Sequence, residues 1–434
     1  MKNRNRVVIT GIGVVAPNGI GIEAFWNSIL DGRSGIGAIT RFDTNGFRSR
    51  IAGEIKGFDP LDHMPAEWKP HRLARHTQLA FAATQMALDD ADFDPTQENA
   101  AAVLPICVGV STSAMDVLER GFTELQQRGP RGVNPGVVRN CQPQAVAHFI
   151  AEKLGVESET VTISSACPSG IDAIASAAGR IRAGDVGIAL AGGADSHVTP
   201  LAMASFASAG LSSFANDDPS RASRPYDAAS DSGVISEGAS IVVLENLERA
   251  LARGVRPYLE ITGYSAQSDP DPDQPCGGLE ATMRLALANA SLPVSDVDYI
   301  CAYGPGHPQL DVAEVQMIRR VFGEHLDHLP VSSIKGVTGN PLAAAGPFQV
   351  TACALAFRDN LLPPTANLEN VHADCELDFV VRKPRKAHLN CAMINVRGLG
   401  GGNSSMVVER FRDNQAFGTR AASNGSSLSR FRFK

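Results

Sequence analysis

The chain has 434 residues, of which 44% are apolar and 20% charged, and this is the composition of an ordinary globular protein. Its length predicts two domains or one duplicated domain. The net charge of −7 argues against a nucleic-acid-binding surface, because phosphate binding needs clustered Lys and Arg. Eight scattered cysteines without a C-x-x-C pair favour the reduced thiols of a cytoplasmic protein over a disulfide framework or a zinc site.

The first apolar segment, Val7–Ala16, follows a basic stretch and so resembles a secretion signal. Two glycines and a threonine interrupt the segment, and Pro17-Asn-Gly19 follows it without a cleavage site. A buried strand and its turn are therefore predicted here. No uninterrupted run of about 18 apolar residues occurs in the sequence, so no membrane span is expected.

Apolar, β-branched segments then alternate with helical patterns along the chain. The predicted strands are Val7–Val15, Ile106–Val110, Thr160–Ile163, Val186–Ala191, Ala239–Leu244, Val297–Ala302 and Ala392–Val396. The predicted helices are His76–Ala91, Gln144–Leu154, Gly170–Ala183, Gly278–Ala290, Asp311–Phe322 and Ala344–Arg358. Such alternation is typical of α/β proteins and predicts parallel sheets with helices on both faces.

A boundary near Val255 divides this pattern into two halves, residues 1–255 and residues 256–412. The segment Asn216–Ser236 is dense in Asp, Ser, Arg and Pro, and we expect a long ordered loop there. Residues 413–434 have little apolar content and a basic end, which indicates a flexible basic tail.

Cys167 lies where a β-branched run changes to small residues and then to an Ala-rich stretch. This pattern predicts a strand, a tight turn and a helix, with the thiol at the joint. A helix N-terminus favours thiolate over thiol, so Cys167 is a candidate nucleophile that carries an acyl group. The alternative is that Cys167 is a small buried hydrophobic residue.

Two glycine clusters and two neighbouring histidines are weak evidence for a cofactor. Gly398–Asn403 joins two predicted strands, whereas a phosphate-binding loop opens a helix, so a turn close to a catalytic centre is expected instead. Gly11-Ile-Gly13 lacks the third glycine of a dinucleotide site. His325 and His328 lack a clear third metal ligand. No cofactor or metal is expected.

Several motifs together resemble the β-ketoacyl-acyl-carrier-protein synthases, the elongation-type condensing enzymes of the thiolase-like superfamily. The resemblance covers about residues 5–411. It rests on Arg6–Gly19, Gly32–Ile36, Arg41–Asp43, Ser165–Cys167, Asp217–Asp227, Ser333–Lys335, Thr338–Gly339, Ala344–Gly346, Pro363–Glu369 and Gly398–Asn403. It implies a five-layer α-β-α-β-α sandwich of two duplicated halves, each with a mixed sheet, and a dimer formed near Val161–Ile163.

The same resemblance implies the chemistry of the site. Such enzymes load an acyl chain onto the cysteine and decarboxylate a malonyl unit held on an acyl carrier protein, and two histidines donate hydrogen bonds to the developing enolate. Here Cys167 and Lys335 match the family motifs and are predicted catalytic residues, but Tyr303 and Asn340 replace the two histidines. A phenol and an amide are both neutral donors, and the loss of one oxyanion donor costs roughly 10²–10³ in rate. Neither side chain is a base that titrates near neutral pH.

Five further residues complete the predicted site. His307 stands at a position that lines the family's pantetheine channel, where an imidazole can restore a donor, plug the channel in part, or serve only the structure. Leu399 replaces the phenylalanine that gates the acyl pocket, so altered acyl-chain selection is expected. Gly400, Pro305 and Phe206 are the other candidate substrate-binding residues.

Three functions remain open from the sequence. The protein is a condensing enzyme with modified donors, a transacylase that forms no carbon–carbon bond, or a chain-length-factor-like partner of an active ketosynthase. Partner subunits of that kind typically lose the cysteine, which this chain keeps. The expected partners are an acyl carrier protein and either a second copy or another ketosynthase-like subunit. The identity of the acyl chain stays open.

Overall fold

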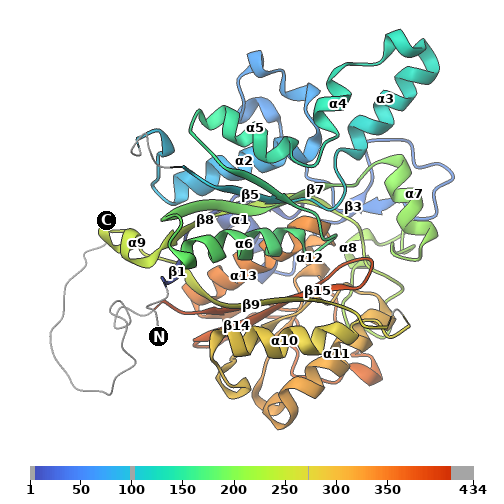
Figure 1. Ribbon diagram of the computed structural model, residues 1–434. Coiled ribbons are helices and arrows are strands. Elements are labelled where there is room, and N and C mark those ends of the chain that lie inside the picture. Colours follow the sequence, from blue (N-terminus) through green and yellow to red (C-terminus); the bar gives the residue numbers. More distant parts are fainter. Residues whose placement is uncertain (1–4, 98–102, 272, 412–434) are drawn as a thin grey trace.

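The computed structural model describes residues 5–97, 103–271 and 273–411, and most of its strands form one long mixed sheet (Figure 1). The predicted tail, residues 413–434, lies outside the described residues. Neighbouring strands follow the order β11 (Val331–Ser332), β10 (Tyr299–Cys301), β14 (Cys391–Arg397), β15 (Gly402–Glu409), β9 (Leu259–Ser268), β1 (Val7–Ala16), β8 (Glu237–Asn246), β7 (Ile188–Ser196), β5 (Ile106–Gly109) and β6 (Thr160–Ile163).

This path folds into two stacked sheets, because β1 and β9 are joined only at one end. Their pairing is limited to Val8 with Glu260 and Ile9 with Leu259. Helices α6 (Ser169–Ala183) and α13 (Ala345–Asp359) fill the space between the two sheets. Helices α2 (Arg75–Asp90) and α5 (Ala145–Leu154) cover one outer face, and α10 (Gly277–Ala290) and α11 (Pro308–Phe322) cover the other (Figure 1). The predicted five-layer sandwich is confirmed.

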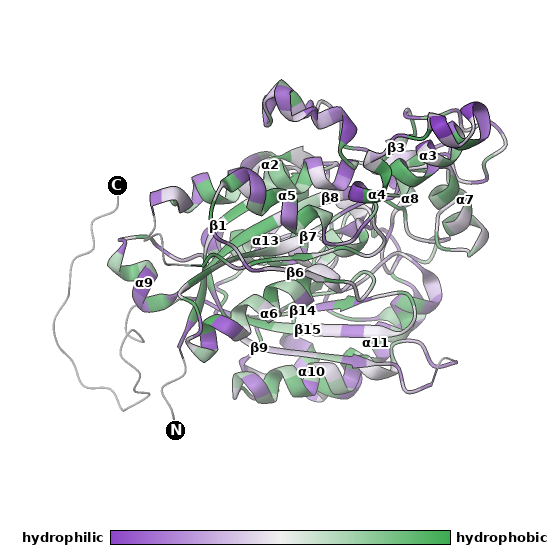
Figure 2. Cartoon of the chain, turned by 45° about the horizontal axis from the view of Figure 1, so that its top comes forward, coloured by the Kyte–Doolittle hydropathy of each residue, from purple (hydrophilic) through white to green (hydrophobic). Residues whose placement is uncertain are grey.

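The two middle helices approach closely because small residues face each other. A Cβ on Gly170 would lie 2.2 Å from the carbonyl oxygen of Ala343, and a Cβ on Gly346 would lie 2.7 Å from Cβ of Ile171. Every described side chain from Ala345 to Phe357 is buried, as expected for a helix with apolar neighbours on all sides. Figure 2 shows the same contrast, with hydrophobic residues on the central strands and inner helices and hydrophilic ones along α3 (Met115–Arg128).

The prediction of parallel sheets is wrong for five of the nine neighbouring strand pairs in this order. β8 is antiparallel to both β1 and β7, and β15 is antiparallel to both β14 and β9, whereas β5 pairs in parallel with β6 and β7. The alternation rule fails where no long helix joins consecutive strands: only the short helices α7 (Pro200–Ser208) and α8 (Pro219–Ala222) and irregular segments lie between β7 and β8, and a short turn links β14 to β15. The expectation of a mixed sheet in each half is correct.

The predicted strands and long helices are all present, with ends shifted by a few residues. The segment Asn216–Ser236 contains only one short helix and is otherwise irregular. The proposed boundary near Val255 falls between α9 and β9. The remaining elements are α1 (Ile22–Leu30), α4 (Gly136–Asn140), α9 (Leu247–Ala252), α12 (Lys335–Thr338), β2 (Gly19–Ile20), β3 (Gly37–Ala38), β4 (Ile51–Ala52), β12 (Leu361–Leu362) and β13 (Arg385–Lys386).

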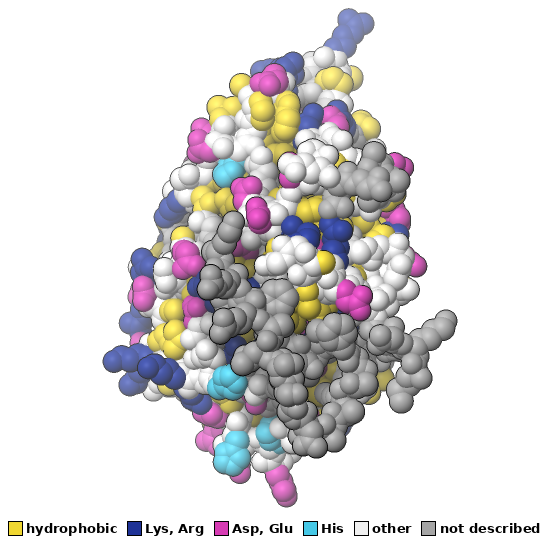
Figure 3. Space-filling model, turned by 90° about the vertical axis from the view of Figure 1, so that its left-hand side faces the viewer, with side chains coloured by type: hydrophobic (Ala, Val, Ile, Leu, Met, Phe, Trp, Pro, Cys, Tyr) yellow, Lys and Arg dark blue, Asp and Glu magenta, His cyan; other side chains and the backbone are white. Residues whose placement is uncertain are grey.

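The surface carries charges of both signs. On the uncovered part of the face in Figure 3, Lys and Arg side chains are interspersed with Asp and Glu. Among the described residues, no helix is long and apolar enough to cross a bilayer. The N-terminal apolar segment is β1, a fully buried strand, as predicted.

Candidate active site

Cys167 lies in a strained turn between β6 and α6. Ala166, just before it, has a φ of 62°, in the left-handed region that residues with a Cβ rarely adopt. Three hydrogen bonds fix the turn: Ser165 N donates to Ser169 Oγ (2.8 Å), and both N and Oγ of Ser169 donate to Ala166 O (3.0 and 2.5 Å). The predicted strand, tight turn and helix are therefore confirmed. Pro168 is the N-cap residue of α6, so the thiol precedes the helix by two residues.

The glycine turn between β14 and β15 passes directly over this thiol-bearing turn. A Cβ on Gly398 would lie 2.7 Å from Cδ of Pro168 and 3.1 Å from the backbone nitrogen of Cys167, so only glycine fits there. The close approach brings the backbone N–H of Leu399 to the sulfur of Cys167. The glycine turn therefore lies against the turn that carries Cys167, the candidate nucleophile.

The environment of Cys167 does not favour the thiolate overall. Burial raises the pKa of Cys167 to about 11, and the charge of Asp195 adds to the effect. The backbone N–H groups of Leu399 and Cys167 and the ammonium of Lys335 act in the opposite direction. The side chain is only 5% exposed, so desolvation of the anion outweighs these donors. Burial thus opposes the stabilisation of the thiolate that the helix N-terminus was expected to give.

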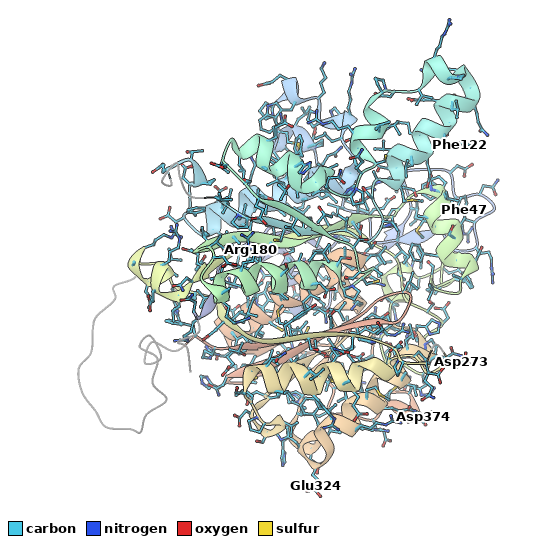
Figure 4. The ribbon with its side chains drawn as sticks, in the orientation of Figure 1. Phe47, Phe122, Arg180, Asp273, Glu324 and Asp374 are labelled. Atoms are coloured by element: carbon cyan, nitrogen blue, oxygen red, sulfur yellow. The ribbon has the colours of Figure 1, made fainter. Side chains whose placement is uncertain are left out.

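Cys167 opens onto a cavity of about 370 Å³ between the two halves of the chain. Seven of the predicted site residues line it: Cys167, Tyr303, Asn340, His307, Leu399, Pro305 and Phe206. Lys335 and Gly400 do not line the cavity. The structure thus brings together residues from five separate segments of the chain. Asp273, also in the lining, lies on the loop before α10 (Figure 4).

Lys335 is buried behind Tyr303 and holds the backbone there. Its Nζ donates to the carbonyl oxygen of Tyr303 and lies 4.9 Å from the centre of the Tyr303 ring. On the other side, Glu314 accepts hydrogen bonds from the N–H groups of Tyr303 and Gly304, both at 2.8 Å. A Cβ on Gly304 would lie 2.6 Å from the hydroxyl oxygen of Tyr226, which explains the glycine. Lys335, one of the predicted catalytic residues, thus contacts the backbone and ring of Tyr303 and does not itself line the cavity.

Tyr303 and Asn340 present polar groups to the cavity. Burial and the neighbouring Cys167 raise the pKa of Tyr303 well above its usual value, so its hydroxyl stays protonated and is available as a donor. The backbone of Asn340 is fixed between Val234 and Ser236 by hydrogen bonds of 2.7 and 3.0 Å. Its Oδ1 is buried and has no hydrogen-bond partner among the described residues. Both side chains thus hold unused hydrogen-bonding capacity.

His307 lies at the rim of the cavity as the N-cap residue of α11. Burial lowers the pKa of its imidazole, so the ring is neutral at pH 7. Its Nδ1 has no hydrogen-bond partner among the described residues. Within the described part of the chain, no group of three or more His, Cys, Asp or Glu side chains is placed to hold a metal ion.

Arg397 is a lining residue that the sequence analysis missed. It is the last residue of β14, and its Nη2 donates to Oδ2 of Asp269 at 2.8 Å. The available signal was one cation at the end of the otherwise uncharged strand Cys391–Val396, immediately before the glycine turn. An isolated charge in a buried strand needs a partner or a function.

Comparisons with known proteins agree with this geometry. Residues 4–250 match the family model of the β-ketoacyl synthase N-terminal domain, and residues 258–369 match that of the C-terminal domain. The chain is 35% identical to 3-oxoacyl-acyl-carrier-protein synthase 2 of Vibrio harveyi, over 95% of this chain and 100% of that protein. It is 37% identical to a putative polyketide β-ketoacyl synthase 1 of Streptomyces cyaneus, over 93% and 97%.

Solved structures show the same likeness. The ishigamide ketosynthase/chain length factor is 31% identical with a TM-score of 0.86, over 94% of this chain and 100% of that one. A β-ketoacyl synthase from Burkholderia phymatum STM815 is 30% identical with a TM-score of 0.86, over the same shares. Because the family models cover most of the chain and the fold and nucleophile turn agree with them, this protein belongs to the β-ketoacyl synthase family.

Proposed function

We propose that the protein transfers acyl groups from an acyl carrier protein to Cys167 during fatty-acid or polyketide synthesis. One observation carries this proposal: the backbone N–H groups of Leu399 and Cys167 both lie next to the sulfur of Cys167. Two donors at this place stabilise the negative oxygen that forms when a thiol attacks a thioester. The relatives named as acyl-carrier-protein synthases and polyketide synthases support the carrier protein as the source of the acyl group.

The acylation step is balanced without an added base. The sulfur of Cys167 forms a bond to the thioester carbonyl carbon, and the bond from that carbon to the carrier's pantetheine sulfur breaks. The departing thiolate takes up the proton that Cys167 loses, so one thiol replaces another. Because the leaving thiolate takes up the proton, the reaction starts and ends with a neutral thiol, the form that burial favours by raising the pKa of Cys167 to about 11.

For the finer activity we propose condensation, with Tyr303 and Asn340 as neutral donors to the enolate oxygen of a malonyl thioester. Both residues line the cavity that contains Cys167. Removal of one such donor costs roughly 10²–10³ in rate, and a neutral replacement keeps part of the stabilisation. Lys335 and Glu314 support this role, because they hold the Tyr303 backbone from two sides.

A second candidate function is transacylation without carbon–carbon bond formation. The observation that favours it is the scarcity of bases: within the described residues, His307 is the only histidine in the cavity lining. Thiol–thioester exchange needs no base, whereas condensation must stabilise an enolate as well. A purely non-enzymatic partner role fits less well, because Cys167 and its two backbone donors are intact.

We also propose that the protein forms a dimer through β6. This strand ends the sheet and its described side chains are only partly buried, so its free edge can pair with a second chain. Phe122 on α3 is 61% exposed and points away from the body of the molecule, which offers further apolar surface (Figure 4). Light scattering of the purified chain tests self-pairing, and a monomer at micromolar concentration would favour a different ketosynthase-like subunit as the partner.

All eight cysteines are free thiols, which fits the cytoplasmic location that we propose.

One experiment separates the functions. The protein is incubated with acyl-loaded carrier protein, the mass of the intact chain is measured, and malonyl-loaded carrier protein is then added. An acyl adduct followed by an elongated product supports condensation, and an adduct without elongation supports transacylation. Absence of any adduct contradicts acyl transfer. Cys141→Ala is the matched control, since Cys141 is half-buried and lies outside the cavity lining.

A further inference from the structure

Arg397 places a positive charge in the wall of the reaction cavity. It follows Val396, whose side chain is fully buried, and the alternation of side chains along β14 turns Arg397 to the opposite face. The next residue, Gly398, packs against the turn that carries Cys167. Arg397 also lines the cavity together with Cys167 and Tyr303. The guanidinium is thus within the compartment where an acyl group on Cys167 would lie.

Asp269 fixes this guanidinium in place. Its Oδ2 accepts from Nη2 of Arg397 at 2.8 Å. The same carboxylate also accepts from Cys276 N (3.2 Å), Gly278 N (2.9 Å) and Asn403 Nδ2 (2.7 Å). Two of these donors are backbone N–H groups at the start of α10, where a helix stabilises negative charge. The negative charge of Asp269 is therefore stabilised by the start of α10 as well as by Arg397. The positive charge of Arg397 is for this reason only partly compensated.

Arg397 retains donors that no described group uses. Its side chain is only 12% exposed, and its buried Nε has no hydrogen-bond partner among the described residues. An arginine stays charged at all physiological pH values and offers five N–H donors in a planar fork that matches a carboxylate. A buried charged donor without an acceptor is costly, and a ligand oxyanion removes that cost.

From these observations we propose that Arg397 binds a carboxylate of the acyl group, so that the site selects acyl thioesters that end in a free carboxylate. The substrate class is the monothioester of a dicarboxylic acid on a carrier protein. The inference rests on the proposed acyl transfer to Cys167. Asp269 is the positioning residue that aims the guanidinium. Asp273 is the one acidic residue in the described cavity lining, and its charge disfavours binding of such a carboxylate next to it.

Two small alkylating reagents test the charge preference without a carrier protein. Iodoacetate and iodoacetamide have nearly the same shape, but only iodoacetate leaves a carboxylate on the sulfur. Peptide mass mapping gives the ratio of their rates at Cys167 and, as an internal reference, at Cys141. We expect the ratio at Cys167 to exceed that at Cys141 by about tenfold, the effect of one charge-assisted hydrogen bond. Equal ratios at the two cysteines overturn the proposal.

Variants at position 397 assign the effect. Arg397→Met should reduce the iodoacetate preference at Cys167 to that of Cys141, and Arg397→Lys should keep part of it. If Arg397 only stabilises the loop before α10, Arg397→Met lowers the melting temperature and slows both reagents equally. The double variant Arg397→Met with Asp269→Asn removes both charges, so it controls for an unpaired buried carboxylate.

Thioesters then test the substrate class. Succinyl-loaded carrier protein is compared with 4-methylpentanoyl-loaded carrier protein, in which an isopropyl group replaces the carboxylate at nearly the same size. We expect faster acylation of Cys167 by the succinyl thioester in the unmodified protein, and loss of that preference in Arg397→Met. Preference for the uncharged chain overturns the inference. If neither thioester acylates Cys167, the proposed function fails, while the alkylation ratio still decides the role of Arg397.

Discussion

The raised pKa of Cys167 gives a direct prediction for the pH dependence of its reactivity. The reactive species is the thiolate, and with a pKa of about 11 only about one part in 10⁴ of the thiol is ionised at pH 7. Below its pKa the thiolate fraction rises about tenfold with each pH unit. Alkylation of Cys167 by iodoacetamide should therefore rise with this slope from pH 7 to pH 10, without a plateau.

Two substitutions test the causes of the shift. Asp195 raises the pKa of Cys167 by its charge, so Asp195→Asn should speed alkylation at pH 9. Lys335 lowers the same pKa, so Lys335→Met should slow alkylation. The rate is measured by peptide mass mapping, with Cys141 as a reference for reagent decay. A plateau below about pH 9.5 would refute the reasoning, because it would mean that the backbone donors outweigh burial.

The other predictions concern the nucleophile and its surroundings. Cys167→Ala should abolish the acyl adduct in an intact-mass measurement and leave the oligomeric state unchanged, since a small buried residue loses little packing. Tyr303→Phe should cut condensation by more than about tenfold, with acylation nearly unchanged; unchanged turnover would favour transacylation. Tyr303→His combined with Asn340→His should create or raise malonyl decarboxylation, measured as released carbon dioxide, and no gain would point to a reshaped pocket. Gly398→Ala places a Cβ 2.7 Å from Cδ of Pro168, so it should slow acylation and cost about 1–3 kcal/mol of stability in thermal unfolding.

Local patterns were sufficient to predict the segments that build the site. The change from β-branched to small to Ala-rich residues around Cys167 predicts the strand, turn and helix, because each part has its own backbone preference. The glycines from Gly398 to Gly402 predict a close backbone approach, and a Cβ on Gly398 would indeed clash with the turn at Cys167. These features depend on neighbours in the sequence, so a single chain carries the information.

Features that depend on distant partners could not be predicted in this way. The direction of β8 relative to β7 is set by how the chain returns after a long loop, and hydrophobic alternation does not record direction. The pKa of Cys167 depends on burial under the turn at Leu399, some 230 residues away in the chain. The position of the Arg397 side chain also depends on a distant partner, because Asp269, which binds its guanidinium, lies on the loop before α10.

The hydrogen-bond donors of the site come partly from the backbone and partly from side chains. Only the side-chain donors change directly when a residue is substituted. The N–H groups beside the sulfur of Cys167 come from Cys167 itself and from Leu399. Their position follows from the strained φ of Ala166 and from the closeness of Gly398, so any chain with this fold and these small residues keeps them. Tyr303, Asn340 and Arg397 line the same cavity with their side chains, so a single substitution at any of them changes which groups face the cavity. Under the proposed function, acylation therefore depends on backbone donors that the fold itself supplies, whereas the fate and the charge of the acyl group depend on the side chains of Tyr303, Asn340 and Arg397.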